Sequence, residues 1–294
     1  MRVSVNAELA QAIPGFGKGC DYLDRRALAK EITAIEEGLL KPDVGQGLII
    51  GITGAPGVGK SCLIDALLHC WTPGLKVAVL AVDPTSPISG GALLGDRIRM
   101  TSLDDSERRE SIYLRSIATR SASGSTPYIV SDLCSHLLAR DFDLVVIETV
   151  GAGQAEIRCA AMADRIIVIE GPSRGDGVQA EKAGILELAD LVVVNKCDLP
   201  GADVVVNQLS MSLDLDIEPP TVVKVSALKG DGIEPLAKTI LSLKKRTTSE
   251  KARIRERLMI ANERRFLESM DFKAAVDSIH GGLSTIESIM ESSK

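Results

Sequence analysis

Residues 54–61, GAPGVGKS, combine glycines with a lysine and a serine at a spacing that suits phosphate chemistry. The pattern G-x-x-x-x-G-K-[ST] is met by Gly54, Gly59, Lys60 and Ser61. An apolar stretch precedes the run and a segment with helical spacing follows it, which is the context that a phosphate-binding loop requires. Glycines let backbone N–H groups converge on phosphate oxygens, and the N-terminal end of a helix favours negative charge. The alternative is a plain glycine turn that caps a helix.

The side chains of this loop have separate expected roles. Lys60 would reach the β- and γ-phosphate oxygens, and the Ser61 hydroxyl would ligate Mg²⁺. These roles predict that the chain binds a nucleoside triphosphate together with magnesium. The residues expected to surround the nucleotide's phosphates are Gly54, Ala55, Pro56, Gly57, Val58, Gly59, Lys60, Ser61 and Cys62.

Three acidic residues stand where a Mg²⁺ ion or a catalytic water could be held, because ligands of parallel sheets bind beyond the carboxyl ends of the strands. Asp83 closes the apolar run KVAVLAVD, Glu148 closes FDLVVIE, and Asp96 lies in the Gly-rich stretch GGALLGDR, which suits a switch loop. We expect the metal ligands to be Ser61, Asp83, Asp96 and Glu148, and the catalytic group to be the same acids with Lys60. The alternatives are a cap or turn residue for Asp83, a surface acid for Asp96 and a structural ion pair for Glu148.

Asn195, Lys196 and Asp198 form the motif N-K-x-D directly after the apolar run LADLVVV. A carboxylate here can accept hydrogen bonds from guanine N1–H and from the exocyclic amino group, and adenine has neither donor on that edge. The motif therefore favours GTP over ATP. The next predicted strand is followed by VSALKGDGI, where Ser226 and Ala227 could present backbone N–H groups to the guanine carbonyl. We expect the base to be held by Asn195, Lys196, Asp198, Ser226, Ala227 and Leu228.

Apolar runs that could form strands alternate with segments of helical spacing. The runs are Lys76–Asp83, Phe142–Thr149, Arg165–Glu170, Leu191–Asn195 and the weaker Thr221–Val225. The helical patterns include Arg25–Leu40, with Leu28, Ile32, Ile35 and Leu39 on one face, and Pro127–Ala139, Gln154–Ala163, Val178–Ala189 and Ile233–Leu243. This alternation indicates an α/β fold of the P-loop NTPase type, with a mostly parallel sheet covered by helices on both faces.

The predicted domain organisation has three parts. They are an N-terminal helical extension over residues 1–46, the nucleotide-binding domain over 47–246 and a C-terminal helical extension over 247–294. Within the last part, Glu250–Met270 is dense in charge, with Ile254, Leu258 and Leu267 on one stripe. This pattern fits either a solvated helix packed on the domain or a helix that binds a second copy or a partner.

Composition and charge exclude several classes of protein. The net charge of −6 argues against general nucleic-acid binding, because no broad basic surface is implied. Without a signal-peptide pattern or a long apolar run, we expect a cytoplasmic protein that does not enter a membrane. The cysteines include no C-x-x-C pair. Those in helical stretches are expected to be reduced core thiols, with a disulfide or metal role as the alternative; they are Cys62, Cys70, Cys134 and Cys159.

With these motifs in hand, the chain resembles the MeaB/ArgK/MMAA family of P-loop GTPases, accessory proteins of cobalamin-dependent methylmalonyl-CoA mutase. The resemblance runs from about Arg25 to Leu243 and is carried by RRALAKEIT, GITGAPGVGKS, VAVLAVDPTSPISGGALLGDRIRM, FDLVVIETVGAGQAE, LADLVVVNKCDLPG and VSALKGDGI. It implies a homodimeric GTPase of low intrinsic turnover, which binds the mutase and uses GTP to gate cofactor loading and to protect the enzyme. It also implies switch roles for Gly151, Gln154 and Lys182.

The chain departs from the family pattern at three places. Cys62 follows Ser61 where the family usually has Thr, Ala161 stands where an acid is usual, and PSRGDG replaces PGAGDE. The first change leaves the expected Mg²⁺-binding hydroxyl intact, because that hydroxyl belongs to Ser61. The last change lies in the segment that contains Lys182, for which the resemblance implies a switch role.

Three other functions stay open on sequence grounds. A kinase linked to amino-acid transport would need a site for the phosphate acceptor and a preference for ATP, whereas N-K-x-D favours GTP. A metal-insertion GTPase for a hydrogenase or urease would need a metal store, yet His69, His136 and His280 are far apart and have no cysteine at ligand spacing. The third is a scaffold that binds nucleotide without turnover.

Overall fold

The computed structural model describes most of the chain. The described residues are 24–72, 74–84, 102, 106–119, 126–149, 158–172, 180–214, 216–269 and 271–292. The predictions for Asp96, Gly151 and Gln154 lie outside these residues. For Asp83 and Lys182 the backbone is described and the side chain is not.

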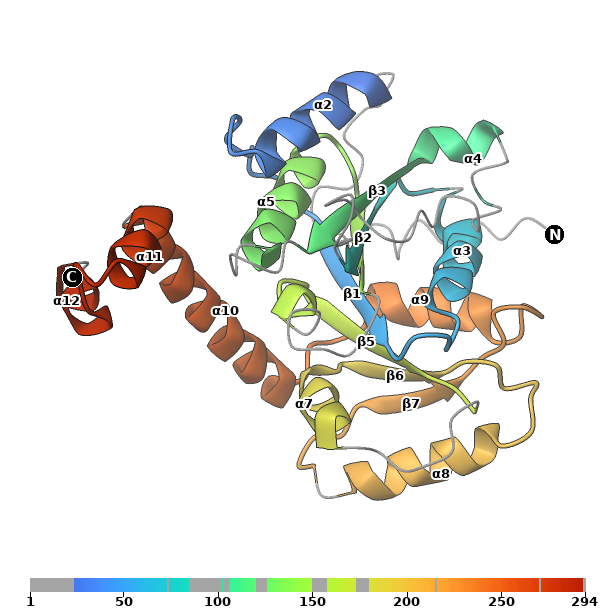
Figure 1. Cartoon of the computed structure of the whole chain (residues 1–294). Helices are drawn as coiled ribbons and strands as arrows, with labels where there is room; N and C mark the ends of the chain where they lie inside the picture. Colours follow the sequence, from blue (N-terminus) through green and yellow to red (C-terminus); the bar gives the residue numbers. More distant parts are fainter. Residues whose placement is uncertain are drawn as a thin grey trace.

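Seven strands form one sheet in the order β3-β2-β4-β1-β5-β6-β7 (Figure 1). The strands are β1 (Leu48–Gly54), β2 (Val77–Pro84), β3 (Ile112–Thr119), β4 (Leu144–Thr149), β5 (Arg165–Glu170), β6 (Leu191–Val194) and β7 (Thr221–Lys224). All neighbouring strands of this sheet are parallel. Their carboxyl ends therefore meet at one edge, and the predicted α/β fold of the P-loop type is confirmed.

Helices cover both faces of this sheet. The helices of the domain are α2 (Arg25–Glu36), α3 (Lys60–Trp71), α4 (Ser106–Ser111), α5 (Thr126–Ala139), α7 (Ala180–Leu188), α8 (Ala202–Leu213) and α9 (Ile233–Ser242). One apolar layer joins α3 and α9 to the sheet, and Val77 and Val79 of β2 belong to it. The other joins α2, α5, α7 and α8 to the opposite face, and Ala78 and Leu80 belong to that one. Because both faces are buried, the strands read as continuous apolar runs instead of alternating with polar residues.

The predicted elements agree with the structure in type, and most differences lie at their ends. The helix predicted to reach Leu40 ends at Glu36, because the chain turns away at Gly38, which has a φ of 73°. Leu39, expected on the same helix face as Leu28, Ile32 and Ile35, lies beyond the end of the helix and is 77% exposed. Strand β3 was not predicted at all: Arg115 and Ser116 interrupt its apolar pattern, and the strand lies at the edge of the sheet.

Three helices follow the domain, and they are α10 (Thr247–Glu268), α11 (Phe272–His280) and α12 (Ile286–Ser292). Helix α10 starts near α7 and carries α11 and α12 away from the sheet (Figure 1). Ile254 and Leu258 of the apolar stripe are 48% and 66% exposed, while Ala252, Arg253 and Ile260 are buried, so another face of α10 packs on the domain. The side chain of Leu267 lies outside the described residues. The three-part division of the chain stays a prediction. No helix among the described residues is both long and apolar enough to cross a bilayer.

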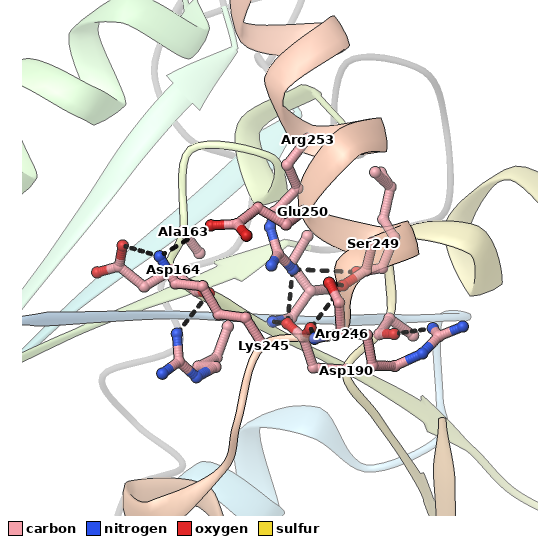
Figure 2. A network of polar contacts seen from close by, with 12 residues as sticks. Ala163, Asp164, Asp190, Lys245, Arg246, Ser249, Glu250 and Arg253 are labelled. Carbon is pink, nitrogen blue, oxygen red and sulfur yellow. Dashed lines mark hydrogen bonds and ion pairs between the residues drawn. The ribbon is translucent and has the colours of Figure 1, made fainter. Parts of the chain in front are cut away.

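A buried carboxylate fastens α10 to the domain (Figure 2). Asp190, the residue before β6, accepts hydrogen bonds from the backbone N–H of Ile166 at 2.9 Å and of Arg246 at 3.2 Å. It also accepts from Ser249 Oγ and from Arg253 Nη1, both at 2.6 Å. The side chains of Asp190 and Arg253 are 0% and 2% exposed. A buried charge is tolerated only when it is paired and hydrogen-bonded, so this carboxylate and α10 depend on each other.

Replacing this carboxylate by an amide tests that dependence. Asp190→Asn removes the negative charge that Arg253 faces, and we expect the free energy of unfolding to fall by about 3 kcal/mol in a urea titration. The control is Asp203→Asn, whose exposed partner Lys224 lies at 2.7 Å, and its expected cost is below about 1 kcal/mol. Equal losses in the two variants would contradict the assigned role of Asp190.

Candidate functional site

The glycine-rich run connects β1 to α3, and close contacts dictate two of its glycines. Gly54 has a φ of 149°, and a Cβ at this position would lie 2.2 Å from the carbonyl oxygen of Ile169 on β5. Gly59, directly before α3, has a φ of 93°, and its Cβ would lie 2.6 Å from Nδ2 of Asn195. Neither position accepts a side chain. The loop therefore lies close against β5 and Asn195 at the N-terminal end of α3, where phosphate oxygens are favoured.

The lysine and the serine of the motif have different partners. Lys60 is buried, and its Nζ donates to the carbonyl oxygens of Gly54 at 2.8 Å and Ala55 at 3.0 Å. Ser61 Oγ donates to Glu148 Oε1 at 2.7 Å, and Glu148 is buried as well. The first turn of α3 and the end of β4 therefore bring together a hydroxyl and a carboxylate.

This pair has the ligand chemistry that Mg²⁺ prefers. Mg²⁺ takes oxygen ligands and is commonly held by one or two carboxylates together with substrate phosphates. Ala81 of β2 is paired in register with Glu148, and Asp83 follows two residues later on the same strand. Asp83 therefore lies at the same sheet edge as Glu148. No group of three His, Cys, Asp or Glu side chains that could hold a metal occurs within the described part of the chain, which leaves out the side chains of Asp83 and Asp96. Ser61 and Glu148 fit a Mg²⁺ site, and the full ligand set stays a prediction.

Asn195 joins the phosphate loop to the turn that is expected to hold the base. It is 2% exposed; its Nδ2 donates to the carbonyl oxygen of Val58 at 2.9 Å, and its Oδ1 accepts from the N–H of Ala227 at 3.0 Å. Lys196 makes a second link, since its Nζ donates to the carbonyl oxygen of Gly57 at 2.8 Å. Both residues therefore contact the phosphate loop, which the motif alone did not reveal.

A charged carboxylate lies beside the same turn. Asp198 Oδ1 accepts from Ser226 Oγ at 2.6 Å, and Lys229 Nζ is 3.6 Å from Asp198 Oδ2. The hydrogen bond from Ser226 is the main cause that lowers the pKa of Asp198 below its ordinary value. The group is therefore ionised at neutral pH and can only accept hydrogen bonds, which matches the two donors on the guanine edge.

The backbone N–H groups of this turn are bonded within the protein. The N–H of Ser226 donates to the carbonyl oxygen of Asp231 at 3.0 Å, and the N–H of Ala227 donates to Asn195. Both groups therefore have an acceptor within the protein, and their contact with the guanine carbonyl stays a prediction. The Ser226 hydroxyl donates in addition to Asp198. Leu228, which follows in the turn, is 84% exposed.

Sequence reasoning missed Asp65, which lies one helical turn beyond Ser61 on α3. Asp65 is 9% exposed, and its Oδ1 accepts from the backbone N–H of Ser102 at 2.9 Å. The available signal was the spacing of four residues, which puts Asp65 and Ser61 on the same side of the helix. Asp65 thus ties the phosphate-loop helix to the chain that precedes α4.

The cysteines follow the expectation only in part. All those in the described part of the chain are free thiols. Cys134 and Cys159 are buried, and burial raises the pKa of the Cys134 thiol. Cys62 is exposed and Cys70 is half-buried, so the prediction of core thiols was wrong for these two. Cys70 packs against the edge of the apolar layer that joins α3 and α9 to the sheet.

Comparison with known proteins assigns the chain to a family. Residues 24–276 match the family model described as "Methylmalonyl Co-A mutase-associated GTPase MeaB". The chain belongs to the MeaB family. The resemblance read from the sequence motifs is confirmed, and the chain is a GTPase like the family members it matches.

Named proteins from several organisms are similar in sequence to this chain. A protein of Pyrococcus horikoshii that is named as a GTPase is 41% identical over 241 residues, covering 76% of this chain and 74% of that protein. GTPase ArgK of Escherichia coli is 36% identical over 206 residues, covering 65% of this chain and 60% of ArgK. A fused isobutyryl-CoA mutase of Cupriavidus metallidurans is 38% identical over 193 residues, covering 61% of this chain and 17% of the mutase.

Solved structures agree on the fold. The crystal structure of a protein titled LAO/AO transport system kinase has a TM-score of 0.60 at 22% identity, covering 92% of each chain. At this identity the likeness supports the fold alone.

Removing the Asn195 amide tests its link between the two loops. In Asn195→Ala the N–H of Ala227 and the carbonyl of Val58 lose their partner, and we expect GDP affinity to fall about tenfold or more in a fluorescence titration. Asn207→Ala, at an exposed position of α8, is the control and should bind GDP like the wild type. An affinity of Asn195→Ala within about twofold of the wild type would refute the link.

Proposed function

We propose that this MeaB-family GTPase is a Mg²⁺-dependent accessory chaperone of a cobalamin-dependent mutase, namely methylmalonyl-CoA mutase. In this role GTP hydrolysis gates cofactor loading and protects the enzyme. The observation that carries the proposal is the relative from Cupriavidus metallidurans, in which a segment 38% identical to this chain belongs to the same polypeptide as an acyl-CoA mutase. The description of the matching family model, a mutase-associated GTPase, supports the same partner.

The phosphate side of the site would bind and orient the triphosphate. Lys60, which now donates to two carbonyls of its own loop, would direct its ammonium to β- and γ-phosphate oxygens. Ser61 and Glu148 would hold Mg²⁺, with Asp83 and Asp96 as further acids; the ion, when bound, offsets the negative charge of the phosphates. Water attacks the γ-phosphorus and the bond to the bridging oxygen breaks, which yields GDP and phosphate. The remaining work of the protein is positioning.

The base side would select guanine through Asp198. Its carboxylate is ionised and lies beside the turn at Ser226. Guanine N1–H and the exocyclic amino group are two donors that a carboxylate can accept together. Adenine would leave that carboxylate without its partners, which is the strongest kind of discrimination that hydrogen bonds provide.

A homodimer and a cytoplasmic location complete the proposal. The C-terminal helices and the turn between α11 and α12 expose apolar side chains that a second copy would cover; they are Leu258, Met259, Val276, Leu283, Ile286 and Met290. The free thiols among the described residues fit a reducing compartment.

Two other functions have only a shared fold behind them, and at this identity a shared fold does not indicate a shared role. The solved structure titled as a transport-system kinase and a hydrogenase maturation factor from Archaeoglobus fulgidus, with a TM-score of 0.50, share the fold at 22% and 21% identity. The named sequence relatives at 36% and 41% identity are GTPases, and they favour GTP hydrolysis over phosphotransfer from ATP.

Changing the base selector tests guanine recognition. In Asp198→Asn the amide offers one acceptor and one donor, which fits the N1–H and the C2 carbonyl of xanthine better than guanine. We expect GTP affinity to fall about a hundredfold and XTP affinity to rise above that for GTP, measured by competition with a fluorescent nucleotide. An unchanged preference for GTP would show that Asp198 does not contact the base.

The purified mutase tests the partner. We expect methylmalonyl-CoA mutase from the source organism to raise the rate of GTP hydrolysis about tenfold or more, measured by phosphate release. Cobalamin loading onto the mutase should in turn depend on GTP hydrolysis by this chain. If isobutyryl-CoA mutase stimulates GTP hydrolysis and methylmalonyl-CoA mutase does not, the assignment of methylmalonyl-CoA mutase as the partner is wrong. No stimulation by either enzyme would overturn the chaperone role.

A further inference from the structure

The turn after β7 holds a lysine close to the carboxylate that is proposed to select the base. Lys229 Nζ lies 3.6 Å from Asp198 Oδ2, and the two side chains are 57% and 12% exposed. This distance is longer than a normal hydrogen bond, so the contact is an ion pair across a short gap. Lys229 belongs neither to N-K-x-D nor to the residues expected to hold the base.

Hydrogen bonds within the turn fix the backbone of Lys229. The N–H of Gly230 donates to the carbonyl oxygen of Ser226 at 2.8 Å, and the N–H of Ser226 donates to that of Asp231 at 3.0 Å. The N–H of Lys229 donates to Ser226 Oγ at 3.3 Å, and the same hydroxyl donates to Asp198 Oδ1 at 2.6 Å. Ser226 therefore ties the backbone of Lys229 to one oxygen of Asp198, while the Lys229 ammonium lies near the other oxygen.

The donors that different bases offer to this carboxylate differ in number. Guanine would bring two, its N1–H and its exocyclic amino group, whereas hypoxanthine, the base of ITP, would bring N1–H alone. A site built to bond a donor rejects an analogue that lacks it, because the polar group of the site is left unpaired. That penalty falls when another donor can reach the same carboxylate. The Lys229 ammonium is such a donor, since it carries three N–H groups on a flexible stem.

The pair is weak enough for Lys229 to give way to guanine. Ion pairs between exposed side chains contribute little to stability, so the ammonium moves aside at small cost when the base brings both donors. The hydrogen bond from Ser226 is the main cause that lowers the pKa of Asp198, and the charge of Lys229 is a lesser one. Removing the ammonium therefore takes away a donor and leaves the main cause of the lowered pKa in place.

We propose that Lys229 is a specificity-determining residue that lets this GTPase bind and hydrolyse ITP as well as GTP. When hypoxanthine occupies the site, the Lys229 ammonium closes the gap to Asp198 and fills the place on the carboxylate that the amino group of guanine would take. Lys229 acts through Asp198 and not through contact with the base. Adenine stays excluded, because it has no hydrogen on N1. The inference rests on the proposed role of Asp198 in selecting the base.

Three variants of the full chain test this role. Lys229→Met removes the ammonium, Lys229→Arg keeps a charged donor, and Lys238→Met is the matched control. Lys238 is 45% exposed and pairs with Glu234 at 2.7 Å on α9. Its charge acts on Cys70, at the end of α3 opposite the phosphate loop. For each protein we measure the affinities for GDP, IDP and ADP by competition with a fluorescent nucleotide, and the release of phosphate from GTP and from ITP.

The wild type is expected to bind IDP within about tenfold of GDP, and ADP far more weakly. Lys229→Met should weaken IDP binding about tenfold further and GDP binding less than about threefold, so that the ratio of the two affinities widens. Lys229→Arg and Lys238→Met should keep the ratio of the wild type. In Lys229→Met the KM for ITP should rise while kcat stays near that for GTP, because the carboxylate acts on binding of the base and not on the γ-phosphate.

Two results would overturn the proposal. One is a wild type that already rejects IDP about a hundredfold or more relative to GDP. The other is a ratio of GDP to IDP affinity that does not change in Lys229→Met, even if both affinities fall together, because that would mean a merely structural role. A failure of the proposed base selection looks different: Asp198→Asn would then keep its preference for GTP. Loss of that preference in Asp198→Asn together with an unchanged ratio in Lys229→Met would refute the role of Lys229 alone.

Discussion

The short strand β6 carries a buried polar residue at each of its ends, and the site and the C-terminal helices both depend on that arrangement. Asp190 precedes the strand and Asn195 follows it, each 2% exposed. Asp190 receives donors from α10, and Asn195 bonds the phosphate loop and the turn at Ala227. Because a buried polar group left without partners costs about 1–3 kcal/mol, neither set of loops can move away from β6 without penalty.

Apolar packing alone would not provide this precision. Both layers of the core are built from Val, Ile, Leu and Ala side chains, and such side chains tolerate alternative packings of similar energy. Hydrogen bonds are directional and therefore fix distance and register. The separation between the phosphate loop and the turn at Ala227 is thus set by the Asn195 amide, and the position of α10 is set by the Asp190 carboxylate. The core supplies stability and these two residues supply position.

The sequence predicted the sheet well where burial is complete and poorly where it is not. Continuous apolar runs marked the inner strands, because strands covered on both faces have no polar alternation. Edge strand β3 was not predicted because Arg115 donates to Thr33 on α2, so a polar side chain occupies a half-buried position in the strand. The buried face of α10 was not predicted for a related reason. Its contacts come from Arg253 and Arg257, whose acceptors lie some 60 to 100 residues earlier in the chain, and no local pattern reports such pairs.

The motifs indicated a chemistry, and the structure adds contacts that the motifs did not indicate. N-K-x-D indicated guanine, and the structure adds that two of its residues hold the phosphate loop while Asp198 lies beside the base turn. Such division of labour depends on contacts between residues far apart in sequence, which spacing within a motif cannot encode.

The same division separates the nucleotide site from the attachment of α10. Asn195 at the carboxyl end of β6 bonds the phosphate loop and the turn at Ala227, and Asp190 at its amino end holds α10. A displacement of the strand would therefore break both sets of hydrogen bonds. The stretch 158–163 lies outside the sheet, and it contacts α10 through the side chains of Arg257 and Glu263. The N–H of Asp164 donates to the carbonyl oxygen of Ile49, near the start of β1, so this stretch lies at the amino ends of the strands. Helix α10 is therefore held at the sheet edge opposite the phosphate loop, by contacts that are separate from the nucleotide site.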